Sequence, residues 1–294
     1  MELQYDGTGL HGWAKQEGLP TVEGSLDGAF RTVLGAAPVL RVAGRTDAGV
    51  HARRQVVSLT LPGELDLLKL RRSLNALTPA GIAVMALCQA PAAFDARANA
   101  ASRAYRYFLS TQPVVSPFWT RYCWQVLPGV LDLSAMRAAA GLVVGRHDFS
   151  AFTPTETEHV FFDRTVLCCR WTKVSGVTAL GPAGPAGAPA TGGAPGAMLY
   201  LEIEADAFLR NMARTLVGTM VEIGRGERSL EEFARLLDGA PREAAGPTAP
   251  AHGLFLWDIR YGRTGMKRPP CGRIPGESGA PTDESTEEPA ASEA

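Results

Sequence analysis

The chain alternates short strand-like runs with single amphipathic helices, and this alternation limits its fold more than any other feature. Apolar residues recur at helical spacing in five segments, which span residues 21–34, 65–77, 134–144, 211–223 and 229–237. Strands are predicted over 39–43, 55–61, 82–87, 104–111, 119–127, 164–175, 198–206 and 253–261. Single helices between strands, some of them joined as hairpins, indicate an α+β sandwich of the ferredoxin-like type.

Two of the predicted helices carry clear start signals. Thr21 is a suitable N-cap for the first helix, because its hydroxyl can accept from a free backbone N–H of the first turn. Ser229 precedes Glu232 by three residues, which is the pattern of a capping box.

The length of 294 residues exceeds what one core usually supports, so we expect two folded parts that meet near Asn99. The first spans 1–99 and the second spans 100–263. The stretch 181–197 contains only Gly, Pro, Ala and Thr and is predicted to be a flexible hairpin loop. The segment 264–294, rich in Pro, Gly, Ser and Glu, is expected to be a disordered acidic tail.

Composition excludes several classes of protein. No run of about 18 apolar residues predicts a membrane helix, and the first residues do not resemble a secretion signal. The five cysteines form no CxxC pair, which favours a reduced, cytoplasmic protein without a cysteine metal site. His51, His147 and His252 match no metal-ligand spacing, and we expect neither metal nor cofactor.

The formal net charge of −1 does not indicate a nucleic-acid binder. Without residues 264–294, however, basic residues slightly outnumber acidic ones, and nearly all of them are arginine. Arginine offers a planar set of donors suited to phosphate, although a genome rich in G and C explains the same bias. A weak overall charge still permits a local basic groove.

The sharpest local signal is the segment 43–52, with the letters AGRTDAGVHA. In extended backbone Arg45 and Asp47 point to the same face, because side chains alternate. Gly44 and Gly49 leave room for a ligand or another backbone to approach. Spacing alone is explained at least as well by a turn in which Asp47 caps a local amide.

This segment resembles the catalytic motif of the tRNA pseudouridine synthase A family. Further matching segments follow in the family's order at 5–9, 12–13, 21–24, 94–97, 103–107, 145–150, 208–214, 246–250 and 252–254. The resemblance covers residues 1–262. It implies the pseudouridine synthase fold, with two ferredoxin-like (RRM-like) halves forming one continuous, mainly antiparallel sheet with flanking helices.

The resemblance also implies an activity. Family members isomerise uridine to pseudouridine in the anticodon stem-loop of tRNA, at positions 38–40, without a cofactor. They act as homodimers, with a tRNA crossing both subunits. By resemblance Asp47 is the essential carboxylate, acting either as a nucleophile or as a base that leads to a glycal.

Other residues take roles from the same resemblance. We expect Arg210 to pair with Asp47 and keep it ionised. Arg45 matches the residue that enters the RNA helix and holds the target nucleotide out, and Tyr105 matches the tyrosine that stacks on the target uracil. Phe208 and Leu209 are expected to form the apolar wall of the pocket, although Leu209 suits the core equally well.

Six further arginines are candidates for phosphate contacts. Each alone also fits a solvated surface charge, but together they would form the basic face that the net charge conceals. They are Arg53, Arg54, Arg97, Arg103, Arg106 and Arg214.

Two rival functions belong to other classes. A non-catalytic RNA-binding protein on the same fold would be expected to lack Asp47 or Tyr105, and both are present. A small-molecule hydrolase using Asp47 with His51 would turn over substrate without RNA and would leave Tyr105 and Arg210 without roles.

Overall fold

The computed structural model describes residues 1–126, 131–157, 160–174 and 197–262. Over these residues the chain is a mixed α/β protein built on one large, mostly antiparallel sheet. The strands are β1 (Glu2–Tyr5), β2 (Arg41–Val42), β3 (His51–Ser58), β4 (Ile82–Ala86), β5 (Ala100–Ser110), β6 (Trp124–Gln125), β7 (Gly145–Asp148), β8 (Asp163–Lys173), β9 (Met198–Ala205) and β10 (Leu254–Tyr261).

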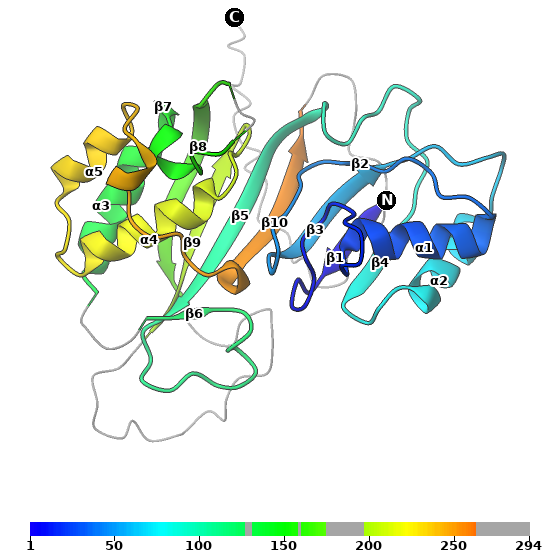
Figure 1. Cartoon of the computed structure of the whole chain (residues 1–294), viewed down its shortest axis with the longest axis horizontal. Coiled ribbons are helices and arrows are strands. Elements are labelled where there is room, and N and C mark those ends of the chain that lie inside the picture. The colour runs from blue at the N-terminus through cyan, green and yellow to red at the C-terminus, as the bar shows by residue number, and fades with distance from the viewer. Residues whose placement is uncertain (127–130, 158–159, 175–196, 263–294) are drawn as a thin grey trace, which may run out of the picture.

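The last strand of the sequence lies in the middle of this sheet. The order is β4-β1-β3-β10-β5-β9-β8-β7, with β2 beside β3 and β6 beside β5. β10 runs parallel to β3 and antiparallel to β5 (Figure 1). A strand from the end of the described residues therefore pairs with two strands from the first 110 residues of the chain.

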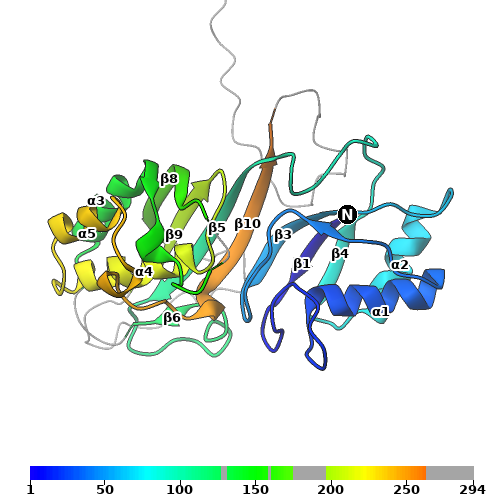
Figure 2. The same cartoon turned by 45° about the horizontal axis from the view of Figure 1, so that its top comes forward.

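The helices cover the two ends of the sheet. They are α1 (Val22–Leu34), α2 (Leu67–Leu77), α3 (Leu133–Val143), α4 (Met212–Gly224) and α5 (Leu230–Leu236), with short 3-10 turns η1 (Ser150–Phe152), η2 (Arg242–Ala244) and η3 (Ala251–Gly253). α1 and α2 lie over one end and α3, α4 and α5 over the other (Figures 1 and 2). The central strands β3, β10 and β5 lie between the two groups.

The helix predictions are confirmed, with small shifts that the caps explain. Thr21 caps α1 and accepts from Gly24 N–H, and Ser229 forms the capping box with Glu232. The predicted start at residue 65 moves to Leu67 because the carboxylate of Asp66 caps α2.

The strand predictions are less accurate. The strand predicted over 119–127 is wrong, because only Trp124–Gln125 pairs with β5. The aromatic residues that suggested a strand there instead pack on a small cluster around Phe108 and Phe255. β3 begins at His51, four residues before its predicted start, and β7 was not predicted. The predicted loop 181–197, apart from Ala197, and the predicted tail lie outside the described residues.

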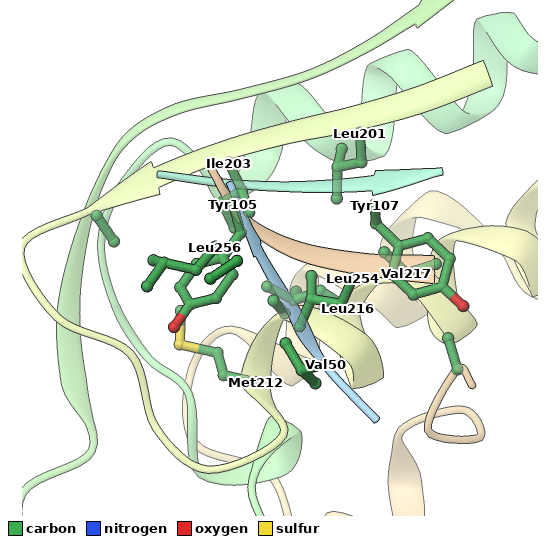
Figure 3. Close-up of a cluster of buried hydrophobic side chains, with 14 of the residues drawn as sticks. Val50, Tyr105, Tyr107, Leu201, Ile203, Met212, Leu216, Val217, Leu254 and Leu256 are labelled. Carbon is green, nitrogen blue, oxygen red and sulfur yellow. The ribbon is translucent and has the colours of Figure 1, made fainter. Parts of the chain in front are cut away.

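The main core lies between the sheet and its helices (Figure 3). Tyr105 and Tyr107 of β5 face Leu254 of β10 and Leu216 of α4, and all four side chains are buried. Each fully buried leucine stabilises the fold by roughly 1.5–3 kcal/mol. This packing fixes the start of α4 over the centre of the sheet.

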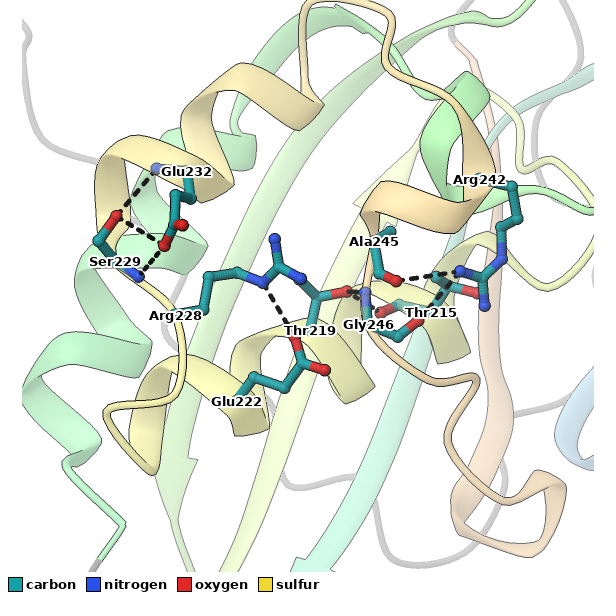
Figure 4. A network of polar contacts seen from close by, with 9 residues as sticks. All are labelled: Thr215, Thr219, Glu222, Arg228, Ser229, Glu232, Arg242, Ala245 and Gly246. Atoms are coloured by element: carbon teal, nitrogen blue, oxygen red, sulfur yellow. Dashed lines mark hydrogen bonds and ion pairs between the residues drawn. The ribbon is translucent and has the colours of Figure 1, made fainter.

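A segment that we call the strap, residues 245–253, crosses α4 at very close range. Gly246 N–H donates to Thr219 Oγ1 at 3.1 Å (Figure 4). The hydroxyls of Thr215 and Thr248 are 3.2 Å apart. A Cβ on Gly218 would overlap the carbonyl oxygen of Pro247. The strap therefore depends on glycine at position 218.

Two further findings concern the described residues. None of their helices is long and apolar enough to cross a membrane. Cys123, Cys168 and Cys169 are free thiols.

Gly218→Ala should destabilise the protein by about 1–3 kcal/mol or more, because the added methyl meets backbone that cannot move away cheaply. Gly28→Ala in α1 is the matched control, since nothing lies within 4 Å of its Cβ position. It should stabilise the protein by about 0.5–1 kcal/mol. Urea unfolding of both variants measures the difference, and equal effects would contradict the close contact with the strap.

Candidate active site

The loop that carries Asp47, residues 43–50, is held by the segment that follows β1. A Cβ on Gly7 would overlap the carbonyl oxygen of Val50, and one on Gly12 would lie 2.7 Å from that of Thr46. Gly12 also has a φ of +85°, which favours glycine. These two glycines let the backbones touch and so fix the height of Asp47 above the sheet.

Buried hydrogen bonds hold the same loop from below. The Tyr5 hydroxyl lies 2.8 Å from Thr46 Oγ1, and Gln55 Nε2 donates to the Gly44 carbonyl at 2.7 Å. Trp13 N–H donates to the Thr46 carbonyl at 3.0 Å. Because buried polar groups are costly to leave unpaired, this network fixes the loop in one conformation.

Asp47 opens into a cavity of about 840 Å³ between the two groups of helices. Its walls come from loop 43–50, from Tyr105 of β5, from residues 207–214 ahead of and within α4, and from Leu254 of β10. A second hollow of about 580 Å³ shares Arg45, Arg97 and Arg103 with it. The two together form one continuous basic groove.

Arg214 is the cation beside Asp47. Its Nη1 lies 4.0 Å from Asp47 Oδ2, with the Asp47 side chain 40% exposed and that of Arg214 17% exposed. At this separation two unit charges attract by about 1 kcal/mol in water and about 4 kcal/mol at the effective dielectric of a protein surface. No hydrogen bond from the described residues reaches the Asp47 carboxylate, so its oxygens face the cavity.

The guanidinium of Arg214 is itself held in place. Its Nε donates to the Ala249 carbonyl at 2.7 Å and its Nη1 to Asn211 Oδ1 at 3.0 Å. Asn211 is the N-cap residue of α4 and has a φ of +60°, a left-handed conformation that asparagine tolerates. Burial lowers the pKa of Arg214, and the charge of Asp47 opposes this shift. Arginine remains a cation at neutral pH.

Arg210 does not make the pairing that the sequence predicted for it. It is exposed, lines the cavity, and forms no ion pair with Asp47. Arg214, predicted to contact phosphate, takes that place instead. The physical reason is helical geometry: Arg210 precedes the N-cap of α4, whereas Arg214 lies in its first turn on the side that faces loop 43–50.

Tyr105 lies on the cavity wall, and only 8% of it is exposed. Its ring meets that of Phe208 edge-on, with centroids 4.8 Å apart. Burial raises the pKa of Tyr105, and the charges of Tyr5 and Asp47 add to this. The phenol is therefore neutral and offers a flat ring and an O–H donor.

The other predicted pocket residues also line this cavity. Phe208 is partly buried and Leu209 is buried, so Leu209 serves both the wall and the core. Arg45 is exposed where the cavity meets the second hollow. Arg97 is exposed on the same groove.

Arg103 lines the cavity but its donors are already occupied. Nε and Nη2 donate to the Ala43 carbonyl, Nη2 also donates to Arg97, and Nη1 donates to Ala100 and Asp206. All these acceptors are backbone carbonyls at 2.8–3.2 Å. Arg103 thus joins loop 43–50 to β5 and the end of β9, and it has no donor left for phosphate.

The remaining three predicted phosphate contacts lie on the opposite face of the sheet, which carries Trp257. Arg53 and Arg106 each lie over the Trp257 ring, at 4.9 and 4.1 Å from its centroid. Arg54 is buried and donates to Glu2 and Asp258. These arginines are therefore not among the residues that line the cavity.

Sequence reasoning missed three residues that shape the site. Gln55 and Thr46 are buried and hold the loop, and Asn211 positions Arg214. Only Asn211 had a readable signal, since asparagine before a helical run is a common N-cap. Glu156 and Thr157, which line the cavity, had none. Among the described residues there is no group of three or more side chains suited to a metal ion.

Comparison with known proteins agrees with this geometry. Residues 139–262 match the family described as tRNA pseudouridine synthase. The tRNA pseudouridine synthase A of Syntrophotalea carbinolica is 39% identical over 265 residues, covering 88% of this chain and 94% of that protein. The chain belongs to the tRNA pseudouridine synthase family.

Other family members are similar over the same length. The tRNA pseudouridine synthase A of Chlorobaculum tepidum is 36% identical over 89% of this chain and 96% of its own length. That of Frankia casuarinae is 37% identical over 89% of this chain and 88% of its own length. The residues that match the family, 139–262, include 207–214 and Leu254, which line the cavity.

Arg103→Lys should destabilise the protein by about 2–3 kcal/mol, because an ammonium cannot bond four carbonyls spread over three segments. Arg97→Lys is the control, since that side chain is exposed, and its effect should stay within about 0.5 kcal/mol. Urea unfolding measures both. Equal stability of the two variants would show that Arg103 does not hold the site together.

Proposed function

We propose that this protein isomerises uridine to pseudouridine in tRNA and that Asp47 is the residue that acts on the target nucleotide. The observation that carries the proposal is the Asp47 carboxylate, open to the cavity and 4.0 Å from the Arg214 guanidinium, with the buried ring of Tyr105 on the same wall. The family membership of the chain supplies the reaction.

The cavity suits a nucleotide that has left its stack. A base stacked inside a helix cannot reach a carboxylate on a cavity wall, so it must turn out at a cost of a few kcal/mol. We assign Arg45, exposed at the junction of the two hollows, to the RNA helix, where it holds the target nucleotide out. Tyr105 offers its ring to the uracil, and Phe208 fixes that ring from its edge.

The chemistry moves one bond from nitrogen to carbon. The bond between C1′ of the ribose and N1 of uracil breaks, the base turns, and C1′ bonds to C5. The C5 proton is lost to solvent and N1 gains a proton from solvent, so substrate and product are isomers. Asp47 acts either as a nucleophile or as a base that leads to a glycal. The Arg214 guanidinium lies 4.0 Å from the Asp47 carboxylate and faces the reacting group on either route.

The finer parts of the proposal rest on the same resemblance. We assign the target to the uridines at positions 38–40 of the anticodon stem-loop and propose a cytoplasmic homodimer. We also propose that 1–99 and 100–263 are ferredoxin-like halves. The order β1-α1-β2-β3-α2-β4 supports this for the first half, as does the spatial order β4-β1-β3-β2.

The rival functions have less support. A hydrolase would need His51 beside Asp47, but His51 is buried, and neither of its nitrogens faces the cavity. A non-catalytic RNA-binding protein would have no need for a carboxylate paired with a cation in a cavity.

Asp47→Asn should abolish turnover, because an amide is neither a nucleophile nor a base. The measurement is tritium release from tRNA labelled at uridine C5, with release expected from the wild type and none above background from the variant. Asp163→Asn, an exposed carboxylate 3.7 Å from Arg146, is the control and should retain release. Equal release from Asp47→Asn and the wild type would remove Asp47 from the mechanism.

Arg214→Lys should lower the turnover rate by about 100-fold, since an ammonium cannot bond Ala249 and Asn211 while facing Asp47. Arg210→Lys, which keeps an exposed charge, should stay within several-fold of the wild type. The same release assay with saturating tRNA compares them. The reverse ranking would return the pairing role to Arg210.

A further inference from the structure

His51 directly follows loop 43–50 and belongs to the segment AGRTDAGVHA. The proposed function gives it no role. It begins β3, four residues after Asp47, and only 1% of it is exposed. Its ring stacks on Phe255 at 4.5 Å and meets Tyr122 edge-on at 5.2 Å. It does not line the cavity, so it cannot touch a nucleotide bound there.

The hydrogen bonds of the ring fix its tautomer. Gly7 N–H donates to Nδ1 at 2.9 Å, so Nδ1 is an acceptor and the ring proton lies on Nε2. Asp6 Oδ1 is also 3.0 Å from Nδ1, but this contact is an ion pair only when the ring is protonated. Burial lowers the pKa of His51, although Asp6 and two carbonyls oppose the shift, and the ring is neutral.

The proton on Nε2 points at the strap. Nε2 lies 3.1 Å from the His252 carbonyl and 3.2 Å from that of Arg121, so one N–H is shared between two acceptors. His252 belongs to η3, which is the last part of the strap. A hydrogen bond from the first residue of β3 thus reaches the segment that crosses α4.

The middle of the strap holds Arg214. The Ala249 carbonyl accepts from Arg214 Nε at 2.7 Å, and Ala249 N–H donates to the Arg214 carbonyl at 3.1 Å. On the loop side, Val50 N–H donates to the Asp47 carbonyl at 3.1 Å, directly before His51. A continuous path of backbone and hydrogen bonds therefore runs from Asp47 through His51 and the strap to Arg214.

We propose that His51 is a positioning residue whose Nε2–H, bonded to the His252 carbonyl, sets the distance between Asp47 and Arg214. The two charged groups come from segments more than 160 residues apart in sequence, and few direct bonds join those segments near the site. A displacement of about 1 Å in such a pair is enough to lower a rate by about 100-fold. The activity test of this role rests on the proposed function, because it measures tritium release from tRNA.

Two substitutions of His51 test the roles of its two ring nitrogens separately. The amide nitrogen of glutamine reaches the position of Nε2, so His51→Gln keeps the bond to His252. The amide oxygen of asparagine occupies the position of Nδ1, so His51→Asn keeps the bond from Gly7 and loses the link to the strap. Both variants lose the ring stacking on Phe255, and similar melting temperatures are expected.

The test is single-turnover tritium release with enzyme in excess over tRNA labelled at uridine C5, together with tRNA affinity. His51→Asn should lower the single-turnover rate by about 10- to 100-fold with tRNA affinity unchanged, and His51→Gln should stay within several-fold of the wild type. Equal rates for the two variants would overturn the proposal. Phe255→Leu, which keeps both ring-nitrogen bonds, should match the wild type, and a loss as large as that of His51→Asn would assign the effect to packing.

Amide hydrogen exchange gives a second readout that needs no turnover. Residues 247–253 should exchange faster in His51→Asn than in His51→Gln, because only the first lacks the bond to the His252 carbonyl. Identical exchange in both variants would overturn the link even if the rates differed. A wild type that releases no tritium would instead refute the proposed function, while the exchange comparison would still decide whether His51 holds the strap.

Discussion

A carboxylate 4.0 Å from a guanidinium is the interaction on which the rest of this structure converges. Neither group would hold that position alone, because Asp47 lies on a loop and Arg214 ends in a long side chain. The loop is fixed by glycine contacts and by the buried Gln55 and Tyr5. The guanidinium is fixed by the strap and by Asn211. Most of the buried polar groups near the cavity serve this geometry.

The two faces of the central sheet use arginine differently. On the cavity face the guanidinium groups of Arg214 and Arg103 donate to backbone carbonyls, and Arg214 also faces Asp47 at 4.0 Å. On the opposite face arginines pair with carboxylates across strands, as Arg106 does with Glu202. A bulge in β3 opposite β1 brings both Arg53 and Arg54 to that face. Arg54 and Arg106 are thus paired with carboxylates, whereas Arg45 and Arg97 beside the cavity are exposed.

The sequence was informative where the signals are local. Helical periodicity and caps at Thr21 and Ser229 placed α1 and α5 correctly, since both depend on neighbouring residues. The predicted strand over 119–127 failed because aromatic residues suit a satellite cluster as well as a sheet. The site depends on distant contacts: choosing Arg214 over Arg210 requires knowing which side of α4 faces the loop. The sequence likewise does not show that the donors of Arg103 are occupied, because their acceptors are backbone carbonyls of other segments.

The central position of β10 has a consequence for how the molecule is made. Among the described residues β10 is the last strand to leave the ribosome, yet it lies between β3 and β5. Until it arrives, His51 and Ala52 at the start of β3 lack their partner strand, and an unpaired strand edge is a site where a nascent chain can associate with another. The strap precedes β10 directly, so Arg214 gains its support at the same moment. A chain cut short before residue 254 would keep Asp47, Tyr105 and Arg214 and still lack the strand that lies between β3 and β5.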